Sequence, residues 1–214
     1  MNIRTLFVVF STLIICSCGL LVKSEVTVFH QIPDNQMPKT YAFVPLEDQI
    51  DDLEYKTYAS LIAEQLKQYG YNEVSLDAAD LFIVFDYSIG SGETSLVSVP
   101  TYGQTGYSSS TTYGILNTYG NYGTYSGTTY YTPTYGVTGS RTVSKTEYPR
   151  KLVLHIIEKP PVDSKEINTI YQAEVDSAGS SSQLSKVMPS MIKALFKEFP
   201  GESGKSRSEV TTIQ

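Results

Sequence analysis

The sequence predicts an α+β protein, with an antiparallel or mixed sheet of about five strands and two amphipathic helices on one face. Three observations support this fold class. Several short segments alternate or are rich in β-branched residues, as strands do. Two other segments repeat apolar residues at helical spacing. The order is strand, strand, helix, strand, insertion, strand, strand, helix, and strands joined by short links favour antiparallel pairing.

The first half of the chain contains three predicted strands and one predicted helix. Residues 26–32 and 40–44 are predicted strands. A helix is expected over residues 51–69, because acidic residues open it, Gly70 follows it and its apolar residues form one stripe of Tyr58, Leu61, Ile62, Leu66 and Tyr69. The nearly continuous apolar run 81–87 predicts a strand covered on both faces or lying next to a helix.

The second half is expected to contain two strands and a second helix. Residues 152–157 and 170–175 are predicted strands. The second helix has an apolar stripe of Leu184, Val187, Met188, Met191, Ile192, Leu195 and Phe199. Pro189 is expected to kink this helix or to mark its start, and Pro200 ends it. The polar tail 201–214 is predicted to be disordered.

An uncharged insertion, residues 94–140, separates the two halves. It contains no Asp, Glu, Lys or Arg, and Gly, Ser and Thr fill most of it. Tyrosine rings suit stacking on sugars or peptides, and neutral aromatic tracts also self-associate as β-structure. The alternative is a loose loop without a partner. Nine of the 17 tyrosines therefore form a candidate interaction surface: Tyr102, Tyr107, Tyr113, Tyr119, Tyr122, Tyr125, Tyr130, Tyr131 and Tyr135.

The N-terminus resembles a bacterial lipoprotein signal. Arg4 precedes an apolar run, residues 6–15, which ends in Ile15-Cys16-Ser17-Cys18. Cleavage before Cys18 would leave its thiol to carry a diacylglycerol, and two or three acyl chains such as palmitate anchor a protein firmly. The predicted organisation is a signal over 1–17, a tether over 18–25 and one domain over 26–200.

Two alternatives to the lipoprotein signal remain open. Together with residues 19–22, the apolar segment approaches the length of about 20 residues that an uncleaved transmembrane anchor needs. An ordinary secretory signal is the other alternative, although no Ala-x-Ala site is present. Gly19, rather than Asp, follows Cys18, so the expected location is the outer membrane, facing the periplasm.

Composition limits the other function classes. The chain has 16 Lys and Arg against 22 Asp and Glu, a formal net charge of −6, and no basic cluster. Nucleic acid is therefore not an expected partner, since phosphate contacts need Lys and Arg. Removal of the signal leaves Cys18 as the sole cysteine, so the fold depends on its hydrophobic core and not on disulfides.

Five segments carry a family resemblance. They are K-T-Y-A-F at 39–43, G-Y at 70–71, D-L-F-I-V at 80–84, L-V-L-H-I at 152–156 and I-K-A-L-F-K-E-F-P at 192–200. In order and spacing they resemble a family of Gram-negative lipoproteins with a single domain of unknown function directly after the lipobox. Members of that family often carry a Gly- and Tyr-rich insertion between the third and fourth strands, as this chain does. They tend to have Trp in the fifth strand, where this chain has Ile170-Tyr171. The resemblance implies fold and location, but no catalytic residues.

No pattern in the sequence predicts catalysis, a metal or a cofactor. The two histidines, His30 and His155, each lie in a predicted strand and lack the spacing of a metal site. Residues 47–54 lack the glycine of a calcium loop, and Gly90-Ser91-Gly92 lacks the third glycine of a dinucleotide site. No Gly-x-Ser-x-Gly elbow is present. The chain is therefore not expected to be an enzyme.

The sequence favours a lipid-anchored cell-envelope protein that acts as a non-catalytic structural or binding module. Its expected partners are the membrane, through the lipid on Cys18, and other envelope proteins or glycan. These would be reached through the insertion or through the sheet face left open by the helices. One alternative is a self-assembling surface or matrix component driven by the insertion. The other is a periplasmic hydrolase with His155 as its base.

Overall fold

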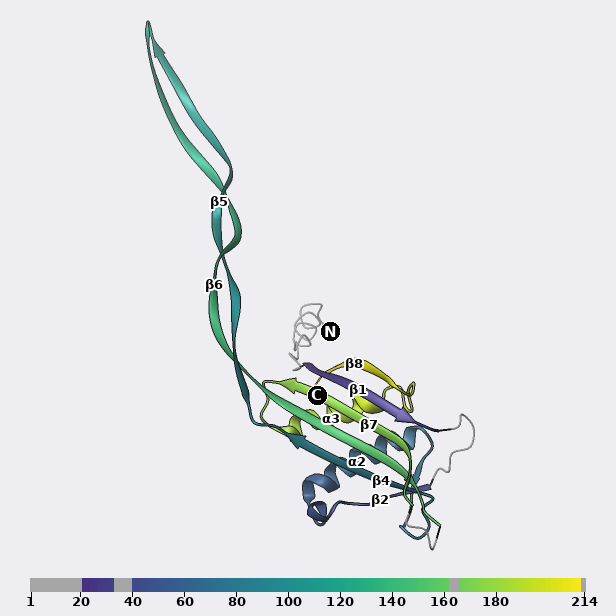
Figure 1. The fold of residues 1–214 in the computed structure, drawn as a ribbon. Coiled ribbons are helices and arrows are strands. Elements are labelled where there is room, and N and C mark those ends of the chain that lie inside the picture. The colour runs from purple at the N-terminus through teal and green to yellow at the C-terminus, as the bar shows by residue number, and fades with distance from the viewer. Residues whose placement is uncertain (1–20, 33–39, 162–165, 213–214) are drawn as a thin grey trace, which may run out of the picture. The chain divides into compact units, whose positions relative to one another are not determined.

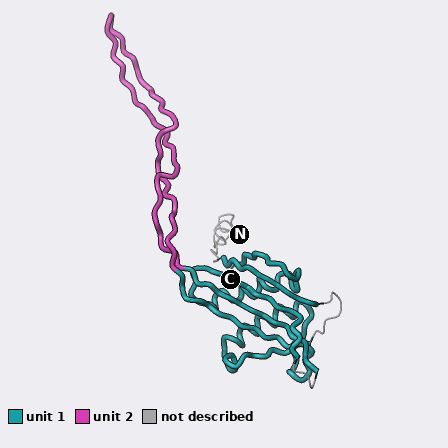
Figure 2. The backbone as a smooth tube through the Cα atoms, viewed as in Figure 1, with its two compact units in different colours: residues 1–93, 147–214 teal, residues 94–146 magenta. Residues whose placement is uncertain are grey.

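The computed structural model describes residues 21–32, 40–161 and 166–212, so Cys18 and the predicted signal lie outside the described part. Figure 1 shows the elements along the chain. The chain divides into two compact units, residues 94–146 and the remainder, 1–93 with 147–214 (Figure 2). We refer to the larger one as the main unit.

The main unit is built on a mixed β-sheet. Its strands follow the order β3-β2-β4-β6-β7-β1-β8, and β5 pairs with β6. The pairs β4–β6, β6–β7, β7–β1 and β1–β8 are antiparallel, whereas β2 is parallel to β3 and β4. The bounds are β1 Leu21–His30, β2 Thr40–Phe43, β3 Asn72–Glu73, β4 Leu81–Ile89, β5 Glu93–Tyr119, β6 Tyr122–Glu158, β7 Asn168–Gly179 and β8 Lys205–Thr212.

Two α-helices cover one face of this sheet, as the ribbon in Figure 1 shows. A 3₁₀ turn, η1 (Glu47–Gln49), precedes α2 (Leu53–Gln68), and α3 (Leu184–Phe196) follows β7. In α2, Tyr55 stacks on Phe85 of β4 with ring centroids 4.6 Å apart. The α3 helix contacts β1, β7 and β8 and also packs on α2. Burial of both apolar stripes against one sheet face forms a single hydrophobic core.

The prediction of about five strands is wrong, although the α+β class is right. The sheet has eight strands. The additional ones are the two-residue β3, the long β5 inside the insertion, and β8 in the tail. The first two predicted strands, β1 and β2, do not pair with each other, because β1 lies between β7 and β8. A short link between strands is thus not sufficient to make them neighbours.

The predicted ends of the domain also need correction. The tail was expected to be disordered from residue 201, but β8 pairs with β1 over the whole length of β8. The tether was expected to reach residue 25, but β1 begins at Leu21. Pro189 lies inside α3 and does not mark its start. A polar strand at the edge of a sheet is difficult to predict from sequence, because its outer edge faces water and its residues need not be apolar.

The start of α2 is stabilised by a capping carboxylate. Asp52 is the N-cap residue, and its side chain accepts hydrogen bonds from the Glu54 N–H at 2.9 Å and from Tyr87 Oη at 2.8 Å. The bond from Tyr87, followed by the one from Glu54, lowers the pKa of the Asp52 carboxyl. A carboxylate at this position also interacts favourably with the helix dipole.

We expect Asp52→Asn to reduce stability in a pH-dependent way. The folded-state pKa of Asp52 lies below its unfolded-state value of about 3.9. The stabilisation is therefore complete above that value and is lost as the pH falls through the folded-state pKa. The Tm difference between wild type and variant should be largest above about pH 5 and shrink below about pH 4. The matched control is Asp51→Asn, because the Asp51 carboxylate is 92% exposed and its 3.5 Å ion pair with Lys56 lies in solvent, where such pairs contribute little. A Tm difference that does not change with pH for Asp52→Asn would contradict this role.

Candidate functional site

The insertion forms a long β-hairpin, not the loose loop considered as an alternative. Strands β5 and β6 pair along it, and the two-residue turn Gly120–Asn121 joins them. Gly120 has a φ of 54°. A positive φ at the first turn position is what the type II′ hairpin requires, and glycine adopts it without strain. At about 3.3 Å per residue the ribbon extends roughly 80 Å.

Pairs of threonine hydroxyls connect the two strands of the hairpin. Side-chain oxygens lie 2.9 Å apart in Thr94–Thr146, 3.2 Å in Thr105–Thr134 and 2.8 Å in Thr112–Thr129. Aromatic contacts add to them, with ring centroids 5.1 Å apart in Tyr107–Tyr131 and 6.1 Å in Tyr113–Tyr130. Cross-strand pairs of these kinds each contribute about 0.2–1 kcal/mol to the stability of a sheet, so they stabilise the pairing of the two strands.

Tyr125 packs over two glycines of the ribbon. A Cβ placed on Gly114 would overlap the Tyr125 ring, and one placed on Gly127 would lie 2.7 Å from the Tyr125 hydroxyl. The ring therefore covers backbone that has no side chain of its own, a device that stabilises glycine within strands. Some of the glycine content of the insertion is thus explained by close packing of tyrosine on the backbone.

All nine tyrosines of the candidate interaction surface are exposed, with exposed fractions of 59–87%. Leu96, Ile115, Leu116 and Val137 in the same hairpin are exposed as well. So many exposed aromatic and aliphatic side chains on one element are uncommon on monomeric proteins and are typical of interaction sites. Because a two-stranded ribbon has no interior, its side chains cannot be shielded within the ribbon itself. The structure thus brings the predicted residues together on one element.

The sheet face opposite the helices is a second open surface. Phe82 and Val84 of β4 and Val153 and Ile157 of β6 are half-buried there. Beside them, Lys151 forms ion pairs with Glu174 and Asp176 of β7. The hydrogen bond from Lys151 lowers the pKa of Glu174. This face is mixed in character and carries a hollow of about 140 Å³ beside Thr27, Phe29, Gln172 and Glu174.

The two histidines lie apart on the main unit. His30 holds the segment before β8: its Nδ1 accepts from the Ile32 N–H at 3.3 Å, so Nε2 donates to the Gly201 carbonyl at 3.1 Å. Both ring nitrogens are thereby engaged. His155 lies on the open sheet face in register with Val84 and Gln172, and its ring forms no hydrogen bond with another described residue. Within the described residues, neither histidine ring forms a hydrogen bond with a Ser, Thr or Cys side chain, and the Ser203 hydroxyl bonds only to the backbone of His30.

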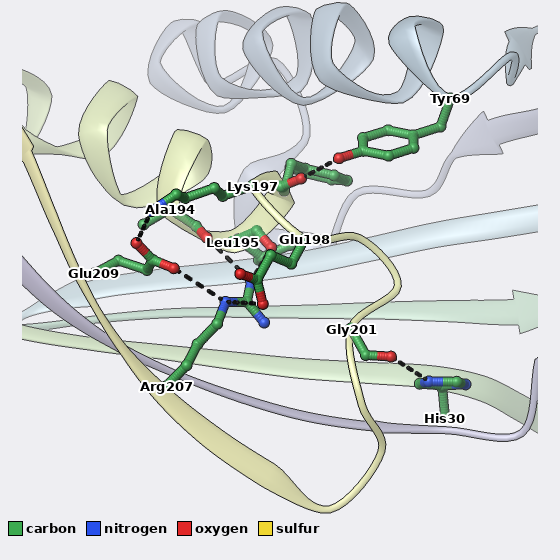
Figure 3. A network of polar contacts seen from close by, with 10 residues as sticks. His30, Tyr69, Ala194, Leu195, Lys197, Glu198, Gly201, Arg207 and Glu209 are labelled. Carbon is green, nitrogen blue, oxygen red and sulfur yellow. Dashed lines mark hydrogen bonds and ion pairs between the residues drawn. The ribbon is translucent and has the colours of Figure 1, made fainter.

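A polar network joins β8 to the end of α3 (Figure 3). Arg207 Nη2 donates to the carbonyls of Ala194 at 3.1 Å and Leu195 at 2.7 Å. Glu209 is 6% exposed and accepts from Lys197 Nζ at 2.6 Å, and it lies 3.5 Å from Arg207 Nε. Cations near a helix C-terminus satisfy carbonyls that have no partner within the helix. The network is therefore a structural clamp.

Buried Arg150 lies on β6 in the main unit, close to the point where the hairpin joins it. It is 4% exposed, and its Nη2 donates to the Ser181 carbonyl at 2.8 Å. Burial lowers the pKa of its guanidinium. Its guanidinium nitrogens would lie 3.4 Å from a Cβ on Gly179, so the group packs directly on the end of β7. Arg150 thus holds the loop that leads into α3.

Two other features are absent from the described ranges. No group of three or more His, Cys, Asp and Glu side chains in residues 21–32, 40–161 and 166–212 could hold a metal ion. Likewise, no helix among these residues combines the length and the apolar character that a membrane span requires.

Sequence reasoning found the tyrosines but missed the turn and the clamp. Gly120-Asn121 lies near the centre of the uncharged tract and is a hairpin signal between two strand-forming runs. Arg207 and Glu209 alternate with Ser206 and Ser208 before Val210-Thr211-Thr212, which is the pattern of an edge strand. Both patterns are weak predictors, because neither segment contains the pattern of apolar residues that marks a buried element.

Comparison with known proteins identifies a family but no activity. The model of a family described as a domain of unknown function, DUF4136, matches residues 25–201. No curated protein matches the chain. The crystal structure of a PDZ domain protein from Parabacteroides distasonis is similar, with 10% identity and a TM-score of 0.43, over 91% of this chain and 40% of that chain. The chain thus spans less than half of that solved protein, whose name says nothing about activity here.

Proposed function

Because the chain belongs to the DUF4136 family of domains of unknown function, we propose its role from its own residues: a lipid-anchored envelope protein that acts as a non-catalytic binding or structural module. The hairpin of residues 94–146 is its contact element. The observation that carries this proposal is the exposure of all nine hairpin tyrosines on a ribbon without interior. A surface of this composition costs free energy in water unless a partner covers it.

The anchor of this protein is Cys18, acylated after removal of residues 1–17. Cys18 precedes Leu21, the first residue of β1, by three positions, a distance of at most about 10 Å along the chain. The end of the sheet where β1 begins therefore lies next to the bilayer. Ser24 of β1 is in the same row of paired residues as Ser177, Arg150 and Ile89. The main unit is thus anchored at the end where β4 leads toward the hairpin.

The location that fits these residues is the outer membrane, facing the periplasm. Gly19 after Cys18 supports export beyond the inner membrane, where Asp would retain the protein. The acidic net charge of −6 offers no attraction to anionic lipid heads, so attachment depends on the acyl chains. The engaged nitrogens of His30 support a non-catalytic role for that residue.

Mass spectrometry of the mature N-terminus tests the anchor. We expect a chain that begins at Cys18 and carries a diacylglycerol on sulfur. Expressed in a Gram-negative host, wild type should fractionate with membranes and label with palmitate, whereas Cys18→Ser should do neither. Cys16→Ser is the matched control and should remain acylated, because Cys16 is removed with the signal. An intact Met1, or a Cys18→Ser protein that behaves as wild type, would contradict the proposal.

A further inference from the structure

The outer edges of the hairpin lack the charged residues that usually prevent another strand from pairing with an edge. In the described chain, β5 pairs only with β6, so the backbone groups on its other side face no strand. No charged residue occurs between Thr94 and Ser140. Natural edge strands usually carry charges, prolines or bulges that prevent pairing with another chain. Over most of its length, this hairpin carries no charged side chain that would oppose pairing with another chain.

The edges of the main sheet are protected by comparison. The edge strand β8 carries Lys205, Arg207 and Glu209 within eight residues. The opposite edge, β3, is two residues long. The same molecule thus blocks strand addition at two edges and permits it at the hairpin. This contrast indicates that the hairpin edges are kept free for pairing.

Strand β5 has the longer edge that can donate hydrogen bonds without interruption. Proline has no N–H and interrupts a ladder. Pro133 divides the hairpin part of β6, whereas in β5 the only proline is Pro100, near its start. Residues 101–119 of β5 therefore form a run of 19 positions with neither proline nor charge. A complete set of main-chain hydrogen bonds to a second strand is available along this run.

We propose that two copies of this protein pair through the outer edges of their β5 strands, at residues 101–119. The pair forms a four-stranded sheet, β6-β5-β5-β6, whose two halves are related by a two-fold axis. A two-fold pairing uses the same edge on both copies and closes as a dimer. Main-chain hydrogen bonds supply the affinity, as in other cases of strand addition.

The composition of the hairpin favours a second copy over other partners. Its strands already pair Thr with Thr and Tyr with Tyr inside one molecule, and the same residue types repeat along β5. Cross-strand pairs of the same residue types would stabilise the contact between the two copies. An uncharged edge also brings no repulsion between two acidic proteins. This inference rests on the proposed function only because a shared membrane raises the effective concentration of copies.

The test measures the oligomeric state of the full chain in detergent by sedimentation equilibrium. The variant Ser110→Lys/Thr111→Lys places two charges on β5. Its matched control, Ser126→Lys/Thr128→Lys, places two charges on β6 of the same hairpin. In the proposed sheet, lysines on the two β5 strands lie about 5 Å apart near the two-fold axis, but those on the two β6 strands lie at least about 15 Å apart, beyond the Debye length of about 8 Å.

We expect wild type to be dimeric, with a Kd that changes less than about threefold between 50 and 500 mM salt, because the edge is uncharged. The β5 variant should raise the Kd by about 30-fold or more, and the β6 variant by less than about threefold. Cys18→Ser should dimerise in solution as wild type does, so failure of the anchor and failure of pairing are distinguishable.

Three results would overturn the pairing. The first is a wild-type protein that remains monomeric at about 100 μM. A monomer that binds cell-wall glycan would count as this same result. The second is an equal effect of the β5 and β6 variants, which would place the contact on a face of the ribbon. The third is growth into open-ended assemblies, since a two-fold contact closes.

Discussion

Replacement of Arg207 by Met is expected to reduce the free energy of unfolding by about 3 kcal/mol. This value is at the lower end of the loss of about 3–5 kcal/mol that follows removal of one partner from a buried ion pair. The variant leaves the Ala194 and Leu195 carbonyls at the end of α3 without their donor. It also leaves Glu209, which is 6% exposed, with Lys197 as its remaining cation. A buried acceptor or charge that loses its partner retains its desolvation cost, so the loss exceeds the value of the bonds themselves.

Urea denaturation measures this effect, with the m-value as a check that the unfolded state is unchanged. Lys205→Met on the same strand is the control, because Lys205 pairs with Glu202 in solvent. It should change stability by less than about 0.5 kcal/mol. The double variant Arg207→Met/Glu209→Gln should recover part of the loss, since the uncompensated charge is removed. Equal losses for Arg207→Met and Lys205→Met would contradict the clamp.

The second large effect is expected in the core under α2. Phe85 is 1% exposed, stacks on Tyr55 and meets Phe43 edge-on with centroids 6.0 Å apart. Phe85→Ala should lower the free energy of unfolding by about 4 kcal/mol, because it removes apolar contacts and leaves a cavity between the sheet and the helix. Urea denaturation measures this loss, and an unchanged m-value would show that the unfolded state is not altered.

Phe29→Ala provides the matched control for Phe85→Ala. Phe29 belongs to the same sheet, but it lies on β1 and is 55% exposed. The same substitution there should cost less than about 1 kcal/mol, since much of the ring is already in water. A comparable loss at the two positions would show that a partner or an unrecognised layer covers Phe29, and would contradict the assignment of the core to the α2 side alone.

The parts of the fold predicted correctly share strong local periodicity. The apolar stripe of α2 and that of α3 repeat every three or four residues, and both helices were found within a few residues of their ends. Burial on one face also made β4, β6 and β7 visible as apolar runs. Such signals depend on neighbours along the chain, and they do not require knowledge of the partner strand.

The candidate site was predicted in composition but not in conformation. The uncharged tract and its nine tyrosines were identified from the sequence, and the structure places them on a single hairpin. Its strands lack an apolar alternation, because both faces and both edges of the ribbon are exposed. Pairing there depends on Thr–Thr and Tyr–Tyr contacts between residues up to 52 positions apart, such as Thr94 and Thr146. No local pattern reports a contact of that range.

Sequence alone therefore determined the two helices, the buried strands and the existence of an uncharged tyrosine-rich tract. Tertiary structure alone decided the strand order, the extension of that tract into a hairpin and the use of the tail as β8. The physical reason is the difference between burial and pairing. Burial of apolar side chains leaves a periodic pattern along the chain, whereas a polar strand is specified by hydrogen bonds to a distant partner, as β8 shows by pairing with β1.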